Sequence, residues 1–108
     1  MENFKSVITG HLDILVHEKE EEFEGVIEEW NEVLIHGDPE GLRSLANLLL
    51  KIADLDQDTV VGLPVGAREH YHLRPNLELA ASSVEAIVGR LDARGTGAFY
   101  DMYVPRKK

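Results

Sequence analysis

Two histidines separated by one residue are the side chains of this sequence that most readily suggest chemistry. His70 and His72 lie in EHYHLRP, residues 69–75, on either side of Tyr71. In a β-strand alternate side chains share a face, so both imidazoles would point the same way and Tyr71 the opposite way. Such a pair can provide two of the three or four protein ligands that a zinc ion takes. A metal site, a catalytic site and a plain strand face are therefore the three interpretations to compare.

The remaining ligands of such a metal site cannot be assigned from the sequence. Cysteine is absent, and no spacing ties His11, His17, His36 or any carboxylate to the pair. No nucleophile and base can be assembled into a catalytic arrangement either. We therefore assign no catalytic residues and no metal ligands, and we interpret the pair as part of a polar strand face, either solvated or offered to a partner. A small metal-binding protein or metal-dependent enzyme centred on His70 and His72 is the alternative.

The densest group of charged residues lies earlier in the chain, from Glu18 to Glu32. This segment has eight glutamates and one lysine, a local charge of −7, in a chain whose net charge is −9. Like charges at this density repel one another and cost stability, which indicates that the field has a use. The simplest use is to attract a basic protein, although glutamates kept for solubility alone would give the same count. The residues expected to steer such a partner are Glu20, Glu21, Glu22, Glu28 and Glu29.

Aromatic residues near the charged segment have two interpretations. Phe23 and Trp30 are assigned to the core, and the alternative is that they act with Tyr71 as anchors inside an acidic rim. His70, Tyr71 and His72 together are the second candidate contact face for a partner. Nucleic acid is a poor partner, because an acidic chain repels phosphate.

The element that must position these groups most firmly is a helix from about Pro39 to Leu55. Asp38 suits the N-cap, because its carboxylate can accept the free amide protons of the first turn. Pro39 suits the next position, where its missing N–H costs nothing. The apolar stripe expected to pack on a sheet consists of Leu42, Leu45, Leu49 and Ile52, widened by Ala46, Leu48 and Ala53.

The region before this helix is predicted only in part. Residues 12–16 alternate and predict a strand, and residues 32–36 predict a second, short one. Residues 18–31 are ambiguous: Phe23, Val26, Ile27 and Trp30 have helical spacing, but Gly25 weakens a helix, and an exposed-edge strand fits equally.

The region after the helix predicts short strands and turns. Residues 56–69 should form a loop with a brief strand at Val60 and Val61, and a strand should follow at 70–74 and end at Pro75. Residues 83–91 fit a strand or a short helix, residues 94–97 a glycine turn, and residues 98–104 a β-prone C-terminal strand. The predicted fold class is α+β, with a small, mostly antiparallel sheet packed against one long amphipathic helix and a second helix left open.

Length and composition place the chain among small globular proteins. A chain of 108 residues fits a single domain over residues 1–108. The absence of cysteine makes a reducing cytosol the default, and no apolar run is long enough to span a membrane. The N-terminus is a poor signal peptide, so we expect a cytoplasmic protein.

The middle of the chain resembles a known family. The run NEVLIHGDPEGLRSLANLLLKIADLD is followed by EHYHLRP and then by SSVEAIVGRL. This order, from about Glu32 to Leu91, is similar to small immunity proteins of bacterial polymorphic toxin systems, most closely those of immunity protein family 32. The resemblance implies a cytoplasmic bacterial protein that binds and neutralises a cognate toxin, without catalysis and without a cofactor.

The leading hypothesis is therefore a non-enzymatic toxin inhibitor that occludes its toxin. The resemblance implies a toxin from systems in which many toxins are basic nucleases. An acidic inhibitor suits such a basic toxin surface. The alternatives are the metal-binding protein or enzyme described above and a structural or regulatory subunit of a larger complex. The toxin, the binding face and the oligomeric state are not predicted.

Overall fold

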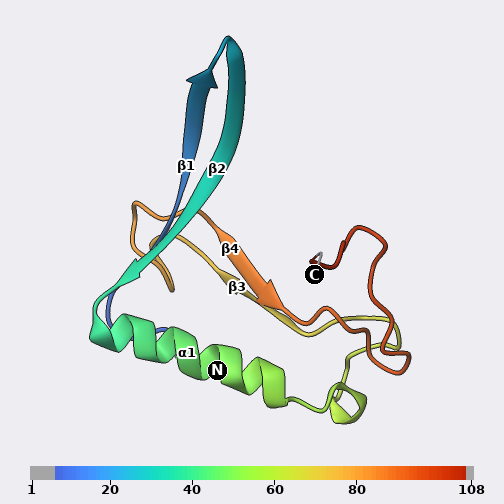
Figure 1. The fold of residues 1–108 in the computed structure, drawn as a ribbon. Helices are drawn as coiled ribbons and strands as arrows, with labels where there is room; N and C mark the ends of the chain where they lie inside the picture. Colours follow the sequence, from blue (N-terminus) through green and yellow to red (C-terminus); the bar gives the residue numbers. More distant parts are fainter. Residues whose placement is uncertain (1–6, 107–108) are drawn as a thin grey trace.

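A computed structural model describes residues 7–106. Its elements follow the order β1 (Leu12–Phe23), β2 (Val26–Gly37), α1 (Pro39–Asp54), a 3-10 turn η1 (Gln57–Thr59), β3 (His70–Leu73) and β4 (Ala86–Gly89). β1 pairs with β2 and β3 with β4, both antiparallel, so the sheet is made in two pieces of two strands. Figure 1 shows β3 and β4 running side by side above α1, while the β1–β2 hairpin rises away from the helix. The α+β class with sheet packed against one helix is confirmed.

The β1–β2 hairpin is long and has a two-residue turn. Glu24 and Gly25 join Phe23 to Val26, and both turn residues have positive φ, 52° and 80°. Positive φ at both central positions is the requirement of a type I′ turn, whose twist matches the flanking strands. The ladder then runs without interruption from the pair Phe23 and Val26 to the pair Leu12 and Gly37. The ambiguous residues 18–31 are therefore strand and turn.

Asp38 joins the start of the helix to the base of the hairpin. Its Oδ1 accepts the Gly41 N–H at 2.7 Å, as an N-cap should, and also the His11 N–H at 3.0 Å. These two backbone donors hold the pKa of the Asp38 carboxyl below its ordinary value. The Asp38 N–H donates in turn to the His11 carbonyl at 3.1 Å. The predicted cap is confirmed, and it orients β1 as well as α1.

The core lies between α1, the base of the hairpin and the inner face of β3–β4. On the outer side of β3–β4, His70 lies opposite Gly89 and His72 opposite Ile87. Tyr71 packs against the core from the inner side. The buried apolar core cluster consists of Ile8, Leu12, Ile14, Leu45, Leu48, Ile52, Leu73 and Leu79.

Among residues 7–106, the segment at 80–84 covers the outer edge of β1 at its first residues. The Ala80 N–H donates to the Leu12 carbonyl at 2.9 Å, and the Val84 N–H donates to the Ile14 carbonyl at 2.8 Å. The buried hydroxyl of Ser83 accepts the Ile14 N–H at 2.9 Å between them. These bonds fix the base of the hairpin to the segment before β4.

The far end of α1 is closed by Arg90, just after β4. Its guanidinium donates to the carbonyls of Ile52 and Leu55 at 3.1 and 2.7 Å. The Ile52 carbonyl also accepts the N–H of the C-cap residue Leu55 at 3.4 Å. The same guanidinium forms a two-bond ion pair with Asp92, at 2.7 and 2.8 Å. This pair raises the pKa of Arg90 and lowers that of Asp92.

Part of the apolar stripe expected to pack on the sheet from α1 is not buried. Leu42 and Leu49 are exposed, because the buried stripe of α1 runs through Gly41, Ser44, Leu45, Leu48 and Ile52, on a neighbouring line of the helix surface.

Two expected strands do not form. Val60 and Val61 belong to no strand, and Val61 is fully exposed after the 3-10 turn. Residues 98–104 are irregular with a turn at 101–102, because no neighbouring strand offers them a ladder. The turn at 94–97 does form, with positive φ at Gly95 and Gly97.

Candidate partner-binding surface

Residues 16–33 form an arm that stands clear of the core. Every residue in this range is exposed, and at about 3.3 Å per residue the strands extend about 25 Å beyond Val16. The radius of gyration is 17.4 Å and the longest dimension is 56 Å, whereas a compact chain of this length has a radius of about 13 Å. Figure 1 shows the arm as the part of the molecule that projects farthest from α1.

The pairing register divides the side chains of the arm between two faces. Residues directly opposite in an antiparallel ladder share a face, and successive rungs alternate between the faces. The Trp30 face carries Lys19, Glu21, Phe23, Val26, Glu28, Trp30 and Glu32, with His17 at its base. The Ile27 face carries Glu18, Glu20, Glu22, Ile27, Glu29 and Asn31, with Val16 and Val33 at its base.

All five glutamates predicted to steer a partner lie on the arm. Glu20 is directly opposite Glu29, and Glu21 is directly opposite Glu28, so two adjacent rungs pair like charges. Such pairs destabilise a ladder, and only Lys19, 3.7 Å from Glu32, offers an ion pair on the arm. Glu22 faces Ile27. The register therefore spreads the steering residues over both faces, with their charges close together.

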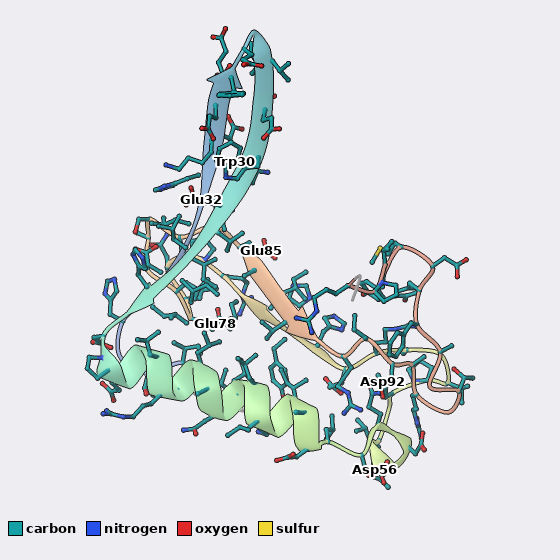
Figure 2. All side chains as sticks on the ribbon, viewed as in Figure 1. Trp30, Glu32, Asp56, Glu78, Glu85 and Asp92 are labelled. Carbon is teal, nitrogen blue, oxygen red and sulfur yellow. The ribbon has the colours of Figure 1, made fainter. Side chains whose placement is uncertain are left out.

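Phe23 and Trp30 are not core residues, contrary to the first assignment. Phe23 is 73% exposed and Trp30 43% exposed, because the arm extends beyond the reach of α1 and β3–β4. Figure 2 shows Trp30 on the arm, with Glu32 nearer its base. A shallow hollow at the tip, beyond Trp30, is lined by Phe23 and Val26 together with Glu21, Glu24 and Glu28. Phe23 and Trp30 therefore lie beside carboxylates on the exposed arm, whereas Tyr71, the third residue of the anchor interpretation, packs against the core from β3.

Val26, Ile27 and Glu32 also belong to this surface and were not among the predicted site residues. The signal that could have found them is the turn at Glu24 and Gly25 with strand-forming residues on both sides. Glu-Gly is a weak version of that signal, since Asn-Gly and Asp-Gly are the pairs typical of type I′ turns.

The histidine pair lies on the second sheet, away from the arm. His70 and His72 are exposed on one face of β3, with ring centroids 5.1 Å apart, as the alternation predicted. His70 Nδ1 lies 2.9 Å from the Arg68 carbonyl, and His72 Nδ1 lies 3.5 Å from a Glu85 carboxylate oxygen. Tyr71 points to the other side and is partly buried. Figure 1 shows β3 well separated from the tip of the arm, so the two predicted contact regions do not form one site.

The part of the chain that the structure describes is residues 7–106. Within that range no group of three or more His, Asp or Glu side chains is arranged to hold a metal ion. No helix in the same range is long and apolar enough to cross a membrane.

Comparison with family models places the chain among the immunity proteins. The model of Immunity protein 32 matches residues 32–91, more than half of the chain. The chain therefore belongs to the Immunity protein 32 family, as the resemblance of its middle segment implied, and this membership indicates toxin immunity in general. Comparisons with curated proteins and with solved structures found no match.

The family match covers the middle of the chain and little of the arm. It begins at Glu32 in β2 and continues through α1, β3 and β4 to Leu91. Residues 16–31, which include the turn, both like-charge rungs and the exposed aromatic side chains, lie outside it. The match therefore includes α1, β3 and β4 but not β1.

Proposed function

We propose that this protein is a non-enzymatic inhibitor that binds a cognate bacterial toxin in the cytoplasm and occludes a basic surface of that toxin. Membership of an immunity protein family supports the general role. The single observation that supports a basic partner is the charge of −7 between Glu18 and Glu32, concentrated on an exposed hairpin. A field of this strength accelerates encounter with an oppositely charged protein.

The glutamates of the arm have the role of steering. Glu20, Glu21, Glu22, Glu28 and Glu29 carry five of the charges, and the two like-charge rungs persist at a cost in stability. A cationic partner relieves that repulsion, so the cost in the free protein becomes a gain in the complex. The same charges disfavour nucleic acid as a partner.

The outer face of β3 is proposed as a second contact region. His70 and His72 present their rings to solvent there, beside the exposed side chain of Ile87. Tyr71 supports this face from behind, where it packs against the core. Contacts at this distance from the arm would require a toxin that spans both the arm and the body.

Growth rescue tests the function. The product of the adjacent upstream gene is expressed in a sensitive host, alone and together with this chain. The expected result is growth arrest relieved only when this chain is present. A neighbour that is harmless, or that kills regardless of this chain, would remove the immunity assignment.

Charge reversal tests the steering role on the purified pair. Changing Glu20, Glu22 and Glu29 to lysine should slow association and weaken its dependence on salt, with a smaller effect on dissociation. An association rate equal to that of the unchanged chain at low salt would contradict steering.

A further inference from the structure

The two faces of the arm differ in a way that bears on how a partner is held. The Trp30 face has three glutamates, one lysine and three exposed apolar side chains, those of Phe23, Val26 and Trp30. The Ile27 face beyond Val16 and Val33 has four glutamates and one apolar side chain. One face thus combines anchors with acidic neighbours, whereas the other is almost wholly charged.

We infer that the Trp30 face is the contact face of the arm and that it docks in a cationic groove with an apolar floor on the toxin. This inference rests on the proposed function and adds to it which side of the arm is buried. The Ile27 face then remains toward solvent and acts only through its field.

The proposed anchors are largely exposed in the free protein. Phe23, Val26 and Trp30 are 73%, 61% and 43% exposed, although the chain has a core cluster between α1 and the sheets. Covering such side chains with a partner removes apolar surface from water and favours binding. Trp and other aromatic residues in a desolvated centre, ringed by polar contacts, are the usual anchors of protein interfaces.

The charges select the class of partner. Glu21, Glu28 and Glu32 flank the anchors on the same face, so a surface that covers the anchors also covers these carboxylates. Burying unpaired carboxylates is costly, and the surface must therefore bring Lys or Arg side chains to them. A second copy of this chain would bring another arm of charge −7 instead, and repulsion disfavours it.

The shape of the arm suits a groove. A two-stranded ribbon is narrow, and one of its edges, along β1 beyond Ile14, is left uncovered by residues 80–84. The turn at Glu24 and Gly25 keeps the tip tight, so Phe23 and Val26 reach the end of the arm as a directly opposed pair. The tip can therefore enter a groove that the wider body cannot.

Matched variants of the full chain test the face assignment against the purified toxin. Trp30→Ala and Phe23→Ala remove anchors from the proposed contact face, and Ile27→Ala removes the apolar side chain of the opposite face. The expected result is dissociation faster by about 30-fold or more for Trp30→Ala and by less than about 3-fold for Ile27→Ala. Thermal unfolding of each free variant checks that the body remains folded.

A second, charge-matched pair separates contact from steering. The first double variant, Glu21→Gln with Glu28→Gln, neutralises the like-charge rung of the Trp30 face. The second, Glu20→Gln with Glu29→Gln, neutralises the adjacent like-charge rung, which lies on the Ile27 face. Both should slow association to a similar extent, and only the first should also speed dissociation.

The outcomes distinguish the inference from the function on which it rests. A wild-type chain that neither binds the toxin nor rescues growth overturns both. A wild-type chain that binds, with Trp30→Ala and Ile27→Ala dissociating equally fast, overturns the face assignment alone. Faster dissociation of Ile27→Ala than of Trp30→Ala would place the contact on the opposite face and likewise overturn it.

Discussion

At Gly41 the backbone of α1 meets the start of the hairpin with no room for a side chain. A Cβ added there would lie 2.0 Å from the His11 carbonyl oxygen, a backbone atom that cannot swing aside. The same place carries the Asp38 cap, which accepts the N–H groups of Gly41 and His11. A single glycine therefore allows α1 and β1 to share one capping carboxylate.

Gly41→Ala should destabilise the protein by about 1–3 kcal/mol, although alanine is the better helix former by about 1 kcal/mol. The reason is that the His11 backbone must move and weaken the Asp38 hydrogen bonds. Thermal unfolding measures the change. Asn47→Ala, at an exposed position of the same helix, is the control and should be neutral or slightly stabilising. A rise in melting temperature for Gly41→Ala would show that the close approach is absent.

Acid should weaken the fold through a few carboxylates of the body. Glu78 accepts the Arg74 guanidinium at 2.9 Å and the Arg74 backbone N–H at 3.1 Å, and the guanidinium lowers its pKa below the ordinary value of 4.5. A lowered folded pKa means that this stabilisation is complete above about pH 4.5 and is lost as pH falls through the folded pKa.

The measurement is the free energy of unfolding from pH 6 downward, for the wild type and for Glu78→Gln. The wild type should lose stability below about pH 4.5, and the loss should be shallower in the variant, which has no carboxyl at this position. Asp38 and Asp92 act in the same direction below their ordinary value of 3.8. Identical pH profiles for the two chains would contradict the assigned role of Glu78.

Among the elements, the helix could be predicted closely and the arm could not. Asp38 and Pro39 mark the start of α1 by local chemistry, which depends on no distant residue, and the structure places the helix at Pro39–Asp54. The secondary structure of the arm was ambiguous from the sequence, because Phe23 and Val26 flank a two-residue turn and are therefore three residues apart, as on one face of a helix. Their exposure depends on how far the hairpin extends past the core, which no local pattern reports.

The same limit explains the other differences. Residues 98–104 have β-forming side chains, but a strand needs a partner, and the structure pairs none with them. Leu42 and Leu49 fit the apolar spacing of α1, yet the close contact at Gly41 sets which line of the helix faces the core. The shared face of His70 and His72 was predictable, because alternation within one strand suffices.

The hydrogen bonds between β1 and β2 should break more easily in the arm than at the base of the hairpin. A hairpin without a third strand or a covering helix is marginal in water, and two like-charge rungs weaken this one further. Amide hydrogen exchange of the free protein should therefore be fast for residues 18–31 and slow for residues 12–15, whose base is fixed to residues 80–84. Equal protection along the whole hairpin would contradict the description of the arm as unsupported.

At the scale of the whole molecule, the structure separates a scaffold from a projecting arm. The core cluster lies entirely outside residues 16–33. The family match, residues 32–91, includes α1, β3 and β4 and leaves out most of the arm. The proposed role of this protein thus depends on the arm for recognition and on the body for stability.

Growth rescue by a chain without the arm tests whether the arm recognises the toxin. Replacing residues 17–32 by Asn-Gly joins Val16 to Val33, which already face each other in the ladder, through a turn of the same type. Circular dichroism and thermal unfolding of this variant check that the body still folds. If the arm recognises the toxin, the shortened protein should fold but should no longer relieve the toxicity of the neighbouring gene product, whereas the full chain does. A folded, armless chain that rescues growth as well as the full chain would contradict the role of the arm in recognition.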